Sequence, residues 1–202
     1  GSDNMKIGSL NISGHAALAP MAGVADRAMR ELCMQYGAAY SITEMVSSKG
    51  LTMQDKKSKE LLLISNSERP TGAQIFGDDP QIMAEAAKKA EEFCKPDFID
   101  INFGCPVKRV AAKGAGAGML RDVPLMVEMA KQIVQAVKIP VTAKTRLGWD
   151  CENIIIDDVA ERLQDVGISA LAIHGRTRSQ MYKGEADWEP IARVKQNPRI
   201  KI

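Results

Sequence analysis

The stretch Phe98-Ile99-Asp100-Ile101-Asn102-Phe103-Gly104-Cys105-Pro106 decides how this chain folds. Its apolar beginning predicts a short buried strand, and a basic, glycine-rich loop over 107–121 follows it. Because a proline next to Cys105 stops regular structure, we expect the thiol at the mouth of the strand, facing a pocket. A buried structural cysteine is the alternative, since free cysteines are among the most buried residues.

On both sides of this stretch, short apolar runs alternate with longer amphipathic stretches. Their starts lie roughly 20 to 40 residues apart, a spacing typical of strand–helix units. The predicted strands are Ala16–Met21, Ala39–Val46, Thr71–Phe76, Phe98–Phe103, Pro140–Lys144 and Ala170–His174. The predicted helices carry apolar stripes at helical spacing, beginning with Met29, Leu32, Cys33 and Tyr36 before Gly37. Asp79-Pro80 predicts the capped start of another helix.

Six strand–helix units in a row predict a parallel sheet covered by helices, either open and doubly wound or closed as a barrel. No G-x-G-x-x-G follows the first strand, so the dinucleotide-binding open sheet lacks its fingerprint. Polar residues instead end almost every strand, which is how a barrel builds its active face. They are Glu44, Gln74, Asn102, Cys105, Lys144, Arg146, His174 and Arg176.

We therefore predict an α/β fold, a (β/α)8 TIM barrel of which this chain supplies about six units. A complete barrel needs eight strands and about 250 residues. This chain has 202 residues, and Ile200-Lys201-Ile202 looks like the opening of a seventh strand. Gly1-Ser2-Asp3-Asn4 before Met5 looks like a tag remnant, so the predicted domain runs over residues 5–202.

The composition, 45% hydrophobic and 26% charged, is that of an ordinary soluble domain. Aromatic residues make up only 4%, which argues against an RNA-binding module built on stacking platforms. The net charge of +2 leaves a nucleic-acid partner to be judged from where the charges lie. Four cysteines without metal-like spacing predict reduced thiols, no metal site and a cytoplasmic location. No segment is apolar enough to predict a membrane span.

Four motifs together resemble the tRNA-dihydrouridine synthase family. They are Ala19-Pro20-Met21-Ala22-Gly23-Val24, Asn102-Phe103-Gly104-Cys105-Pro106, Ala143-Lys144-Thr145-Arg146 and Ile173-His174-Gly175-Arg176-Thr177. Each motif alone is weak or moderate, and their order over nearly the whole chain makes the match specific. The resemblance implies an FMN-binding barrel followed by a helical RNA-binding domain, which would lie beyond Ile202. It also implies reduction of the uridine C5=C6 bond in tRNA, with NADPH or NADH as reductant.

The resemblance also implies roles for particular residues. Cys105 would be the general acid, because reduction of uridine places a proton on C5 and a thiol is mostly protonated at neutral pH. Lys144 would place a positive charge beside the flavin, with a structural ion pair as the alternative. The residues implied as FMN-binding are Pro20, Met21, Ala22, Gln74, Asn102, Lys144 and His174. Turn capping is the alternative for Asn102, and a structural role is the alternative for His174.

Basic residues beside the predicted site are implied as contacts for tRNA phosphates. They are Lys108, Arg109, Arg146, Arg176 and Arg178, and a solvated basic rim is the alternative. The glycines at 114, 116 and 118 suggest a flexible lid or an ordinary exposed loop.

Two other functions stay open at this stage. One is an FMN-barrel dehydrogenase that acts on a free pyrimidine, such as dihydroorotate or dihydropyrimidine, for which the basic loops would have no use. The other is an incomplete barrel without activity, whose unpaired strand edges would favour self-association.

Overall fold

A computed structural model describes residues 5–13, 17–21 and 25–202 of the chain. Ala22, predicted as a cofactor contact, and the proposed tag remnant lie outside the described residues. Among the helices that the model describes, none combines the length and apolarity that crossing a membrane requires.

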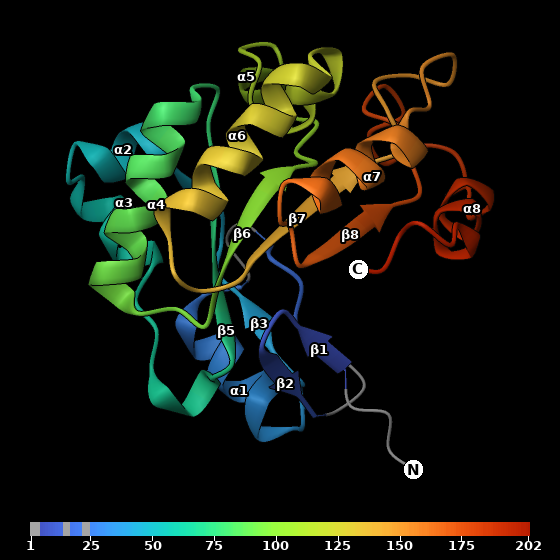
Figure 1. Ribbon diagram of the computed structural model, residues 1–202. Coiled ribbons are helices and arrows are strands. Elements are labelled where there is room, and N and C mark those ends of the chain that lie inside the picture. Colours follow the sequence, from blue (N-terminus) through green and yellow to red (C-terminus); the bar gives the residue numbers. More distant parts are fainter. Residues whose placement is uncertain (1–4, 14–16, 22–24) are drawn as a thin grey trace.

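A curled parallel sheet forms the centre of the molecule (Figure 1). Its hydrogen-bonded order is β3-β5-β6-β7-β8, and β4 also pairs with β5. The strands are β3 (Ser41–Ile42), β4 (Val46–Ser47), β5 (Thr71–Phe76), β6 (Phe98–Phe103), β7 (Val141–Arg146) and β8 (Ala170–His174). Strand order follows chain order, as expected when each strand returns through a helix to pair with the one before.

Helices cover one face of this sheet; α2 contacts α3 and α4, and α4, α6, α7 and α8 contact one another in chain order. They are α2 (Ser48–Thr52), α3 (Lys56–Leu61), α4 (Pro80–Cys94), α6 (Val123–Ala136), α7 (Ile156–Asp165) and α8 (Glu189–Gln196). The start of α4 is as predicted: Asp79 Oδ1 accepts hydrogen bonds from Gln81 N and Ile82 N, and Pro80 occupies the first turn. Two short segments, α5 (Lys108–Ala111) and the 3-10 helix η2 (Gly116–Arg121), lie between β6 and α6.

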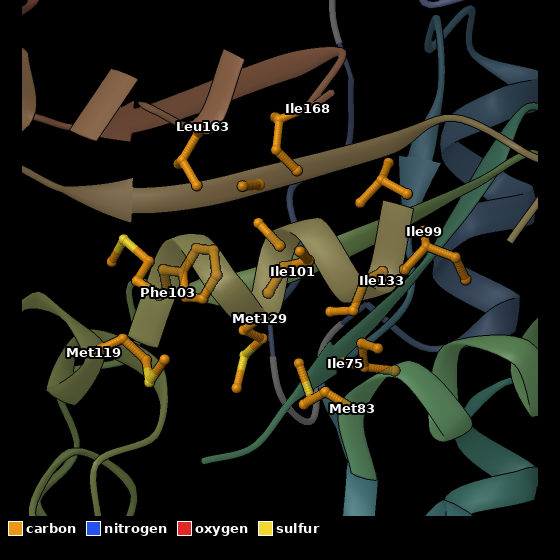
Figure 2. Packing of buried hydrophobic residues seen from close by; sticks show 14 of the residues in the cluster. Ile75, Met83, Ile99, Ile101, Phe103, Met119, Met129, Ile133, Leu163 and Ile168 are labelled. Carbon is orange, nitrogen blue, oxygen red and sulfur yellow. The ribbon is translucent and has the colours of Figure 1, made fainter. Parts of the chain in front are cut away.

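The main hydrophobic core lies between the sheet and this layer of helices (Figure 2). Because side chains alternate along a strand, Ile99, Ile101 and Phe103 of β6 all face the helices. Met129 and Ile133 of α6 are fully buried in the same core cluster as these strand residues. The opposite alternation leaves the other face of each strand for the concave side of the sheet.

That concave side carries the polar residues of the predicted strand ends. Strand register pairs Gln74 with Asp100, Asn102 with Lys144, and Arg146 with His174. Asp100 and Asn102 are two residues apart on β6, as are Lys144 and Arg146 on β7, so each pair lies on one face. The prediction of a partial parallel barrel with polar strand ends is therefore confirmed.

The N-terminal quarter of the chain differs from the prediction. The predicted strand Ala16–Met21 contributes one isolated parallel bridge, Leu18 to Ser41, among its described residues. The predicted strand Ala39–Val46 divides into β3 and β4. An unexpected hairpin, β1 (Met5–Ile7) and β2 (Leu10–Ile12), lies ahead of both and packs Ile7 and Ile12 against Phe98. At the other end, residues 200–202 form no strand.

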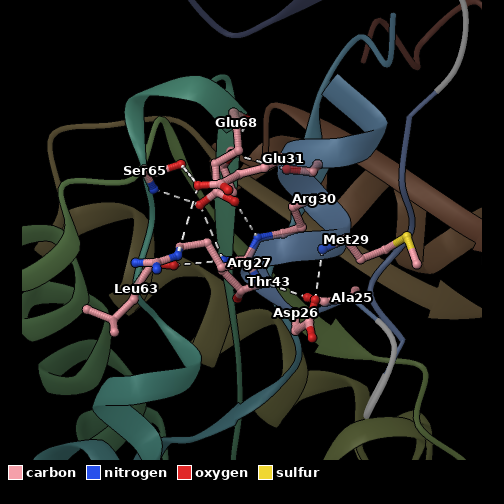
Figure 3. A network of polar contacts seen from close by, with 12 residues as sticks. Ala25, Asp26, Arg27, Met29, Arg30, Glu31, Thr43, Leu63, Ser65 and Glu68 are labelled. Carbon is pink, nitrogen blue, oxygen red and sulfur yellow. Dashed lines mark hydrogen bonds and ion pairs between the residues drawn. The ribbon is translucent and has the colours of Figure 1, made fainter. Parts of the chain in front are cut away.

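Helix α1 (Arg27–Gln35) forms where predicted, but Met29, Leu32 and Tyr36 of its predicted stripe are exposed and Cys33 is partly exposed. Arg30 is its buried residue, 1% exposed, and its Nε donates to Glu68 Oε2 at 3.1 Å (Figure 3). Arg30 Nη1 also donates to Ala25 O, and Nη2 to Leu63 O. The side chain of Arg30 therefore connects α1 and Ala25 to Leu63 and to the 3-10 helix η1 (Asn66–Glu68).

Candidate active site

A cavity of about 600 Å³ opens at the carboxyl ends of the parallel strands. This is the edge where parallel α/β sheets place their ligand sites. Its lining brings together most of the predicted site residues with several that were not predicted. The lining includes Pro20, Met21, Met45, Gln74, Asn102, Cys105, Val107, Arg109, Lys144, Arg146, His174 and Tyr182.

Cys105 stands on the wall of this cavity, in a turn that Asn102 caps. Asn102 Oδ1 accepts hydrogen bonds from Gly104 N at 3.0 Å and Cys105 N at 2.9 Å. An asparagine that accepts two main-chain N–H groups just beyond itself holds the chain in a tight turn. The turn presents the thiol to the cavity, and Cys105 is partly exposed rather than packed into the core.

The part of the glycine-rich segment that forms η2 is packed inside the protein and is not exposed as a lid, whereas Gly114 ahead of it is partly exposed. All residues from Gly116 to Leu120 are buried in η2, and Ala117 N donates to Cys105 O at 3.0 Å. Gly116 has a φ of +54°, and a Cβ there would lie 3.0 Å from the Cβ of Cys105. At Gly118 a Cβ would lie 2.3 Å from Ala111 O. Gly116 and Gly118 therefore permit close packing around the cysteine turn.

Two amide side chains, Gln74 and Asn102, lie side by side at the base of the cavity. Asn102 Nδ2 donates to Gln74 Oε1 at 3.1 Å and also contacts Met45 Sδ at 3.4 Å. With its oxygen occupied by the two main-chain N–H groups, Asn102 has all its amide groups engaged. The turn-capping alternative for Asn102 is thus present in the structure, and its contact with a cofactor stays a prediction.

Lys144 supplies the positive charge at this edge of the sheet. It lies between Asn102 of β6 and Ala172 of β8 in register, is half-buried, and lines the cavity. Within the described ranges no residue forms a hydrogen bond or ion pair with its ammonium group. Its charge acts on Asp100, whose pKa burial raises and Lys144 partly lowers. A cation that lines a cavity and, among the described residues, forms no hydrogen bond or ion pair suits an electron-rich ligand.

His174 ends β8 beside Arg146 and faces the same cavity. Burial lowers its pKa, and the positive charges of Arg146, Arg176 and Lys144 lower it further. Arg176 Nη1 lies 2.9 Å from His174 Nε2. Because a guanidinium only donates, Nε2 accepts, and the hydrogen-bond network assigns the proton of the neutral ring to Nδ1.

Arg146, predicted as an RNA contact, is instead buried at 2% exposure. Its Nε donates to Gly104 O at 2.8 Å, and its Nη1 donates to Thr177 O and Met181 O. The structure therefore uses this guanidinium to connect the cysteine turn with the loop after β8. A buried guanidinium that spends these donors on main-chain carbonyls is poorly placed for phosphates at the surface.

The other basic residues lie nearer the surface, but only one of them lines the cavity. Lys108 and Arg109 begin α5 and are exposed, and Arg109 reaches the cavity. Arg176 turns back to bond Gly184 O as well as His174. Arg178 stacks on Trp149 with its Cζ 4.7 Å from the ring centroid, and Arg121 stacks on the same ring at 4.1 Å.

Sequence reasoning did not predict Met45, Asp100, Tyr182 or Trp149. Asp100 lies in the strand Phe98–Phe103, two residues before Asn102, so the alternation of side chains along a strand could have placed it on the same face as Asn102. Tyr182 and Trp149 lie in loops, where no local periodicity predicts side-chain direction. In the part of the chain that the structure describes, no group of three His, Cys, Asp or Glu side chains gathers to hold a metal.

A curled parallel sheet with its cavity at the carboxyl strand ends defines a protein of the (β/α)-barrel class. The crystal structure of TcOYE with pHBA has this fold: it superposes with a TM-score of 0.70 at 10% identity, over 96% of this chain and 79% of that chain. The family model for Dihydrouridine synthase (Dus) matches residues 17–202. The chain belongs to the dihydrouridine synthase family.

Named relatives agree with this membership. The chain is 44% identical over 198 residues to tRNA-dihydrouridine synthase B of Vibrio vulnificus strain CMCP6. It is 43% identical over 198 residues to tRNA-dihydrouridine synthase B of Pseudomonas aeruginosa strain PAO1. These alignments cover 98% of this chain but 61% and 59% of the relatives. The chain thus spans about three fifths of the length of the curated relatives that it matches.

Proposed function

We propose that this chain carries the catalytic site of a tRNA-dihydrouridine synthase, which reduces the C5=C6 bond of uridine in tRNA with FMN and NADPH or NADH. The observation that carries the proposal is the meeting of Cys105, Gln74, Lys144 and His174 around one cavity of about 600 Å³. That volume lies within the roughly 300–1,000 Å³ of typical cofactor pockets. Family membership and relatives named for this reaction support the same conclusion.

The donors around the cavity suit a flavin. The Lys144 ammonium, unpaired within the described chain, would lie against an electron-rich part of the ring system. Gln74 offers a fixed amide to the pyrimidine edge, and Met21 and Pro20 offer apolar surface. His174, neutral and with Nε2 held by Arg176, would offer Nδ1–H. When bound, FMN supplies the hydride that uridine receives at C6.

Cys105 completes the reaction by supplying the proton. Addition of hydride to C6 of uridine leaves C5 to be protonated, and the Cys105 thiol delivers its proton there as general acid. The resulting thiolate regains a proton from solvent. The turn capped by Asn102 holds the thiol on the cavity wall, so the donor does not have to be ordered when the base arrives.

The exposed basic residues support an RNA substrate over a free pyrimidine. Lys108 and Arg109 begin α5, Arg121 ends η2, and the partly exposed Arg178 lies in the loop after β8, all in segments that follow the carboxyl ends of the strands. A free base carries no phosphate for such residues to bind, whereas tRNA presents one per nucleotide. The target uracil must leave its stack to reach a cavity at the strand ends.

Replacement of Cys105 tests the proposal most directly. In a protein that holds FMN, Cys105→Ala should still be reduced by NADPH but should lose about 10²- to 10⁴-fold in uridine reduction. Both half-reactions can be followed by flavin absorbance, first with NADPH alone and then with tRNA. Cys151→Ala, which removes an exposed cysteine away from the cavity, is the matched control. Uridine reduction at the parent rate in Cys105→Ala would assign the proton to another group.

A further inference from the structure

Asp100 lies beneath the cavity, on the concave face of β6, two residues before Asn102. It is 2% exposed, and it pairs in register with Gln74 of β5 and Thr142 of β7. It does not line the cavity that holds Cys105. We propose that Asp100 is a positioning residue, which fixes the turn of Cys105 through the amides of Gln74 and Asn102. This deepens the proposed function and rests on it for the role of the thiol.

A continuous series of hydrogen bonds connects the carboxylate to the cysteine turn. Gln74 Nε2 donates to Asp100 Oδ2 at 2.7 Å. Asn102 Nδ2 donates to Gln74 Oε1 at 3.1 Å. Gly104 N and Cys105 N donate to Asn102 Oδ1. All these hydrogen bonds are donated in the same direction, from the main chain of Gly104 and Cys105 through Asn102 and Gln74 to Asp100.

The two ends of this series determine the direction of both amides. Main-chain N–H groups can only donate, so the oxygen of Asn102 must face Gly104 and Cys105. Asn102 therefore turns its Nδ2 toward Gln74, which can accept only through its oxygen, so the nitrogen of Gln74 must face Asp100. If either amide were turned over, two N–H groups would face each other. The orientation of both amides thus follows from the network and not from one contact.

Burial makes this arrangement costly to break. Gln74 is 1% exposed, so water cannot replace a lost partner of its amide. The second carboxylate oxygen of Asp100 accepts from Thr142 Oγ1 at 2.5 Å. Both oxygens of Asp100 are therefore engaged inside the sheet, and Asp100 acts on the site through Gln74 and not by contact with a ligand.

Amide hydrogen exchange at Gly104 and Cys105 tests the proposal on the full chain without cofactor or tRNA. In Asp100→Ala, Gln74 loses its acceptor, and exchange at these two amides should rise by about tenfold relative to Ile101 of the same strand. In Asp100→Asn, the amide oxygen accepts from Gln74 while its nitrogen donates to Thr142 Oγ1, so protection should return to the parent ratio. Thr142→Val, which removes the other hydrogen bond to Asp100, should leave the ratio unchanged.

Several results would overturn the proposal. They are an unchanged ratio in Asp100→Ala, an equal rise at all amides of β6, or a failure of Asp100→Asn to restore protection. If Asp100→Ala does not fold, Gln74→Met interrupts the same series one residue later and must raise exchange at the same two amides. Because exchange is measured without substrate, it is independent of the reaction. Full uridine reduction by Cys105→Ala would refute the proposed function and leave the positioning result intact.

Discussion

Replacement of Glu68 with glutamine should destabilise this protein by about 4 kcal/mol, a large share of the 5–15 kcal/mol typical of a folded domain. Glu68 is 0% exposed, and its side chain accepts from Arg30 Nε at 3.1 Å, from Arg30 Nη2 at 3.3 Å and from Ser65 N at 2.9 Å. Glutamine has nearly the same shape but replaces one acceptor oxygen with a donor and removes the charge.

The magnitude follows from what Arg30 loses. Its guanidinium is 1% exposed, so the charge cannot turn to water when its partner is neutral. Two hydrogen bonds to a charged group are each worth about 1.5–3 kcal/mol, and breaking a buried ion pair on one side costs about 3–5 kcal/mol. The bonds from Arg30 to Ala25 O and Leu63 O remain, which keeps the estimate near the middle of that range.

Urea unfolding followed by circular dichroism measures this loss, and thermal melting should show a fall of about 8–16 °C. Asp158→Asn is the matched control, because the Arg162–Asp158 pair on α7 is about half exposed and such pairs contribute about 0–1 kcal/mol. A second control replaces both Arg30 and Glu68 with Met and Leu, which should recover part of the loss, because no charge stays buried although Ala25 O, Leu63 O and Ser65 N lose a partner. A loss below 1 kcal/mol in Glu68→Gln would refute the reasoning.

Three further predictions concern the site. Lys144→Ala should weaken FMN binding by about tenfold or more, because a charged contact is lost. Flavin fluorescence titration measures this affinity, and an unchanged affinity would contradict the prediction. The double variant Lys108→Ala, Arg109→Ala should make the fall of log K with log salt for tRNA binding less steep by about two. Lys131→Ala, on the outer helix α6, is the control. A steepness identical to that of the parent would exclude these phosphate contacts. Burial raises the pKa of Asp100, so its ionised form costs stability at neutral pH, and that cost disappears as pH falls through the raised pKa toward the ordinary 3.8. Asp100→Asn should therefore unfold at higher urea than the parent at pH 7, with the difference shrinking toward pH 4, and lower stability at pH 7 would contradict this sign.

Much of the fold was predictable because its signals are local. The strand Phe98–Phe103 and the helix start at Asp79-Pro80 each follow from residues within one element. Once the strands were predicted to be parallel, their carboxyl ends had to share one edge. That geometry placed Gln74, Cys105, Lys144 and His174 together, and the cavity confirms that they meet.

Other features of the chain were predicted wrongly or not predicted, because they depend on residues that are distant in the sequence. The sequence predicts an apolar stripe on α1, yet the buried residue of this helix is Arg30, because Glu68, 38 residues away, neutralises its charge. The glycines after Cys105 suggested a flexible lid or an exposed loop, yet Gly116 and Gly118 are buried in η2, which packs against α5 and the cysteine turn. Nothing within either segment specifies these contacts.

By itself, then, the sequence determined the parallel strand–helix order and the edge at which the chemistry gathers, since periodicity and strand ends are local properties. Only the tertiary structure decided what each polar side chain does there. Arg146 donates hydrogen bonds to three main-chain carbonyls inside the protein, and the amide oxygen of Asn102 accepts from the main chain of the cysteine turn. A buried polar group must find a partner, and which partner lies within reach depends on how separate elements pack.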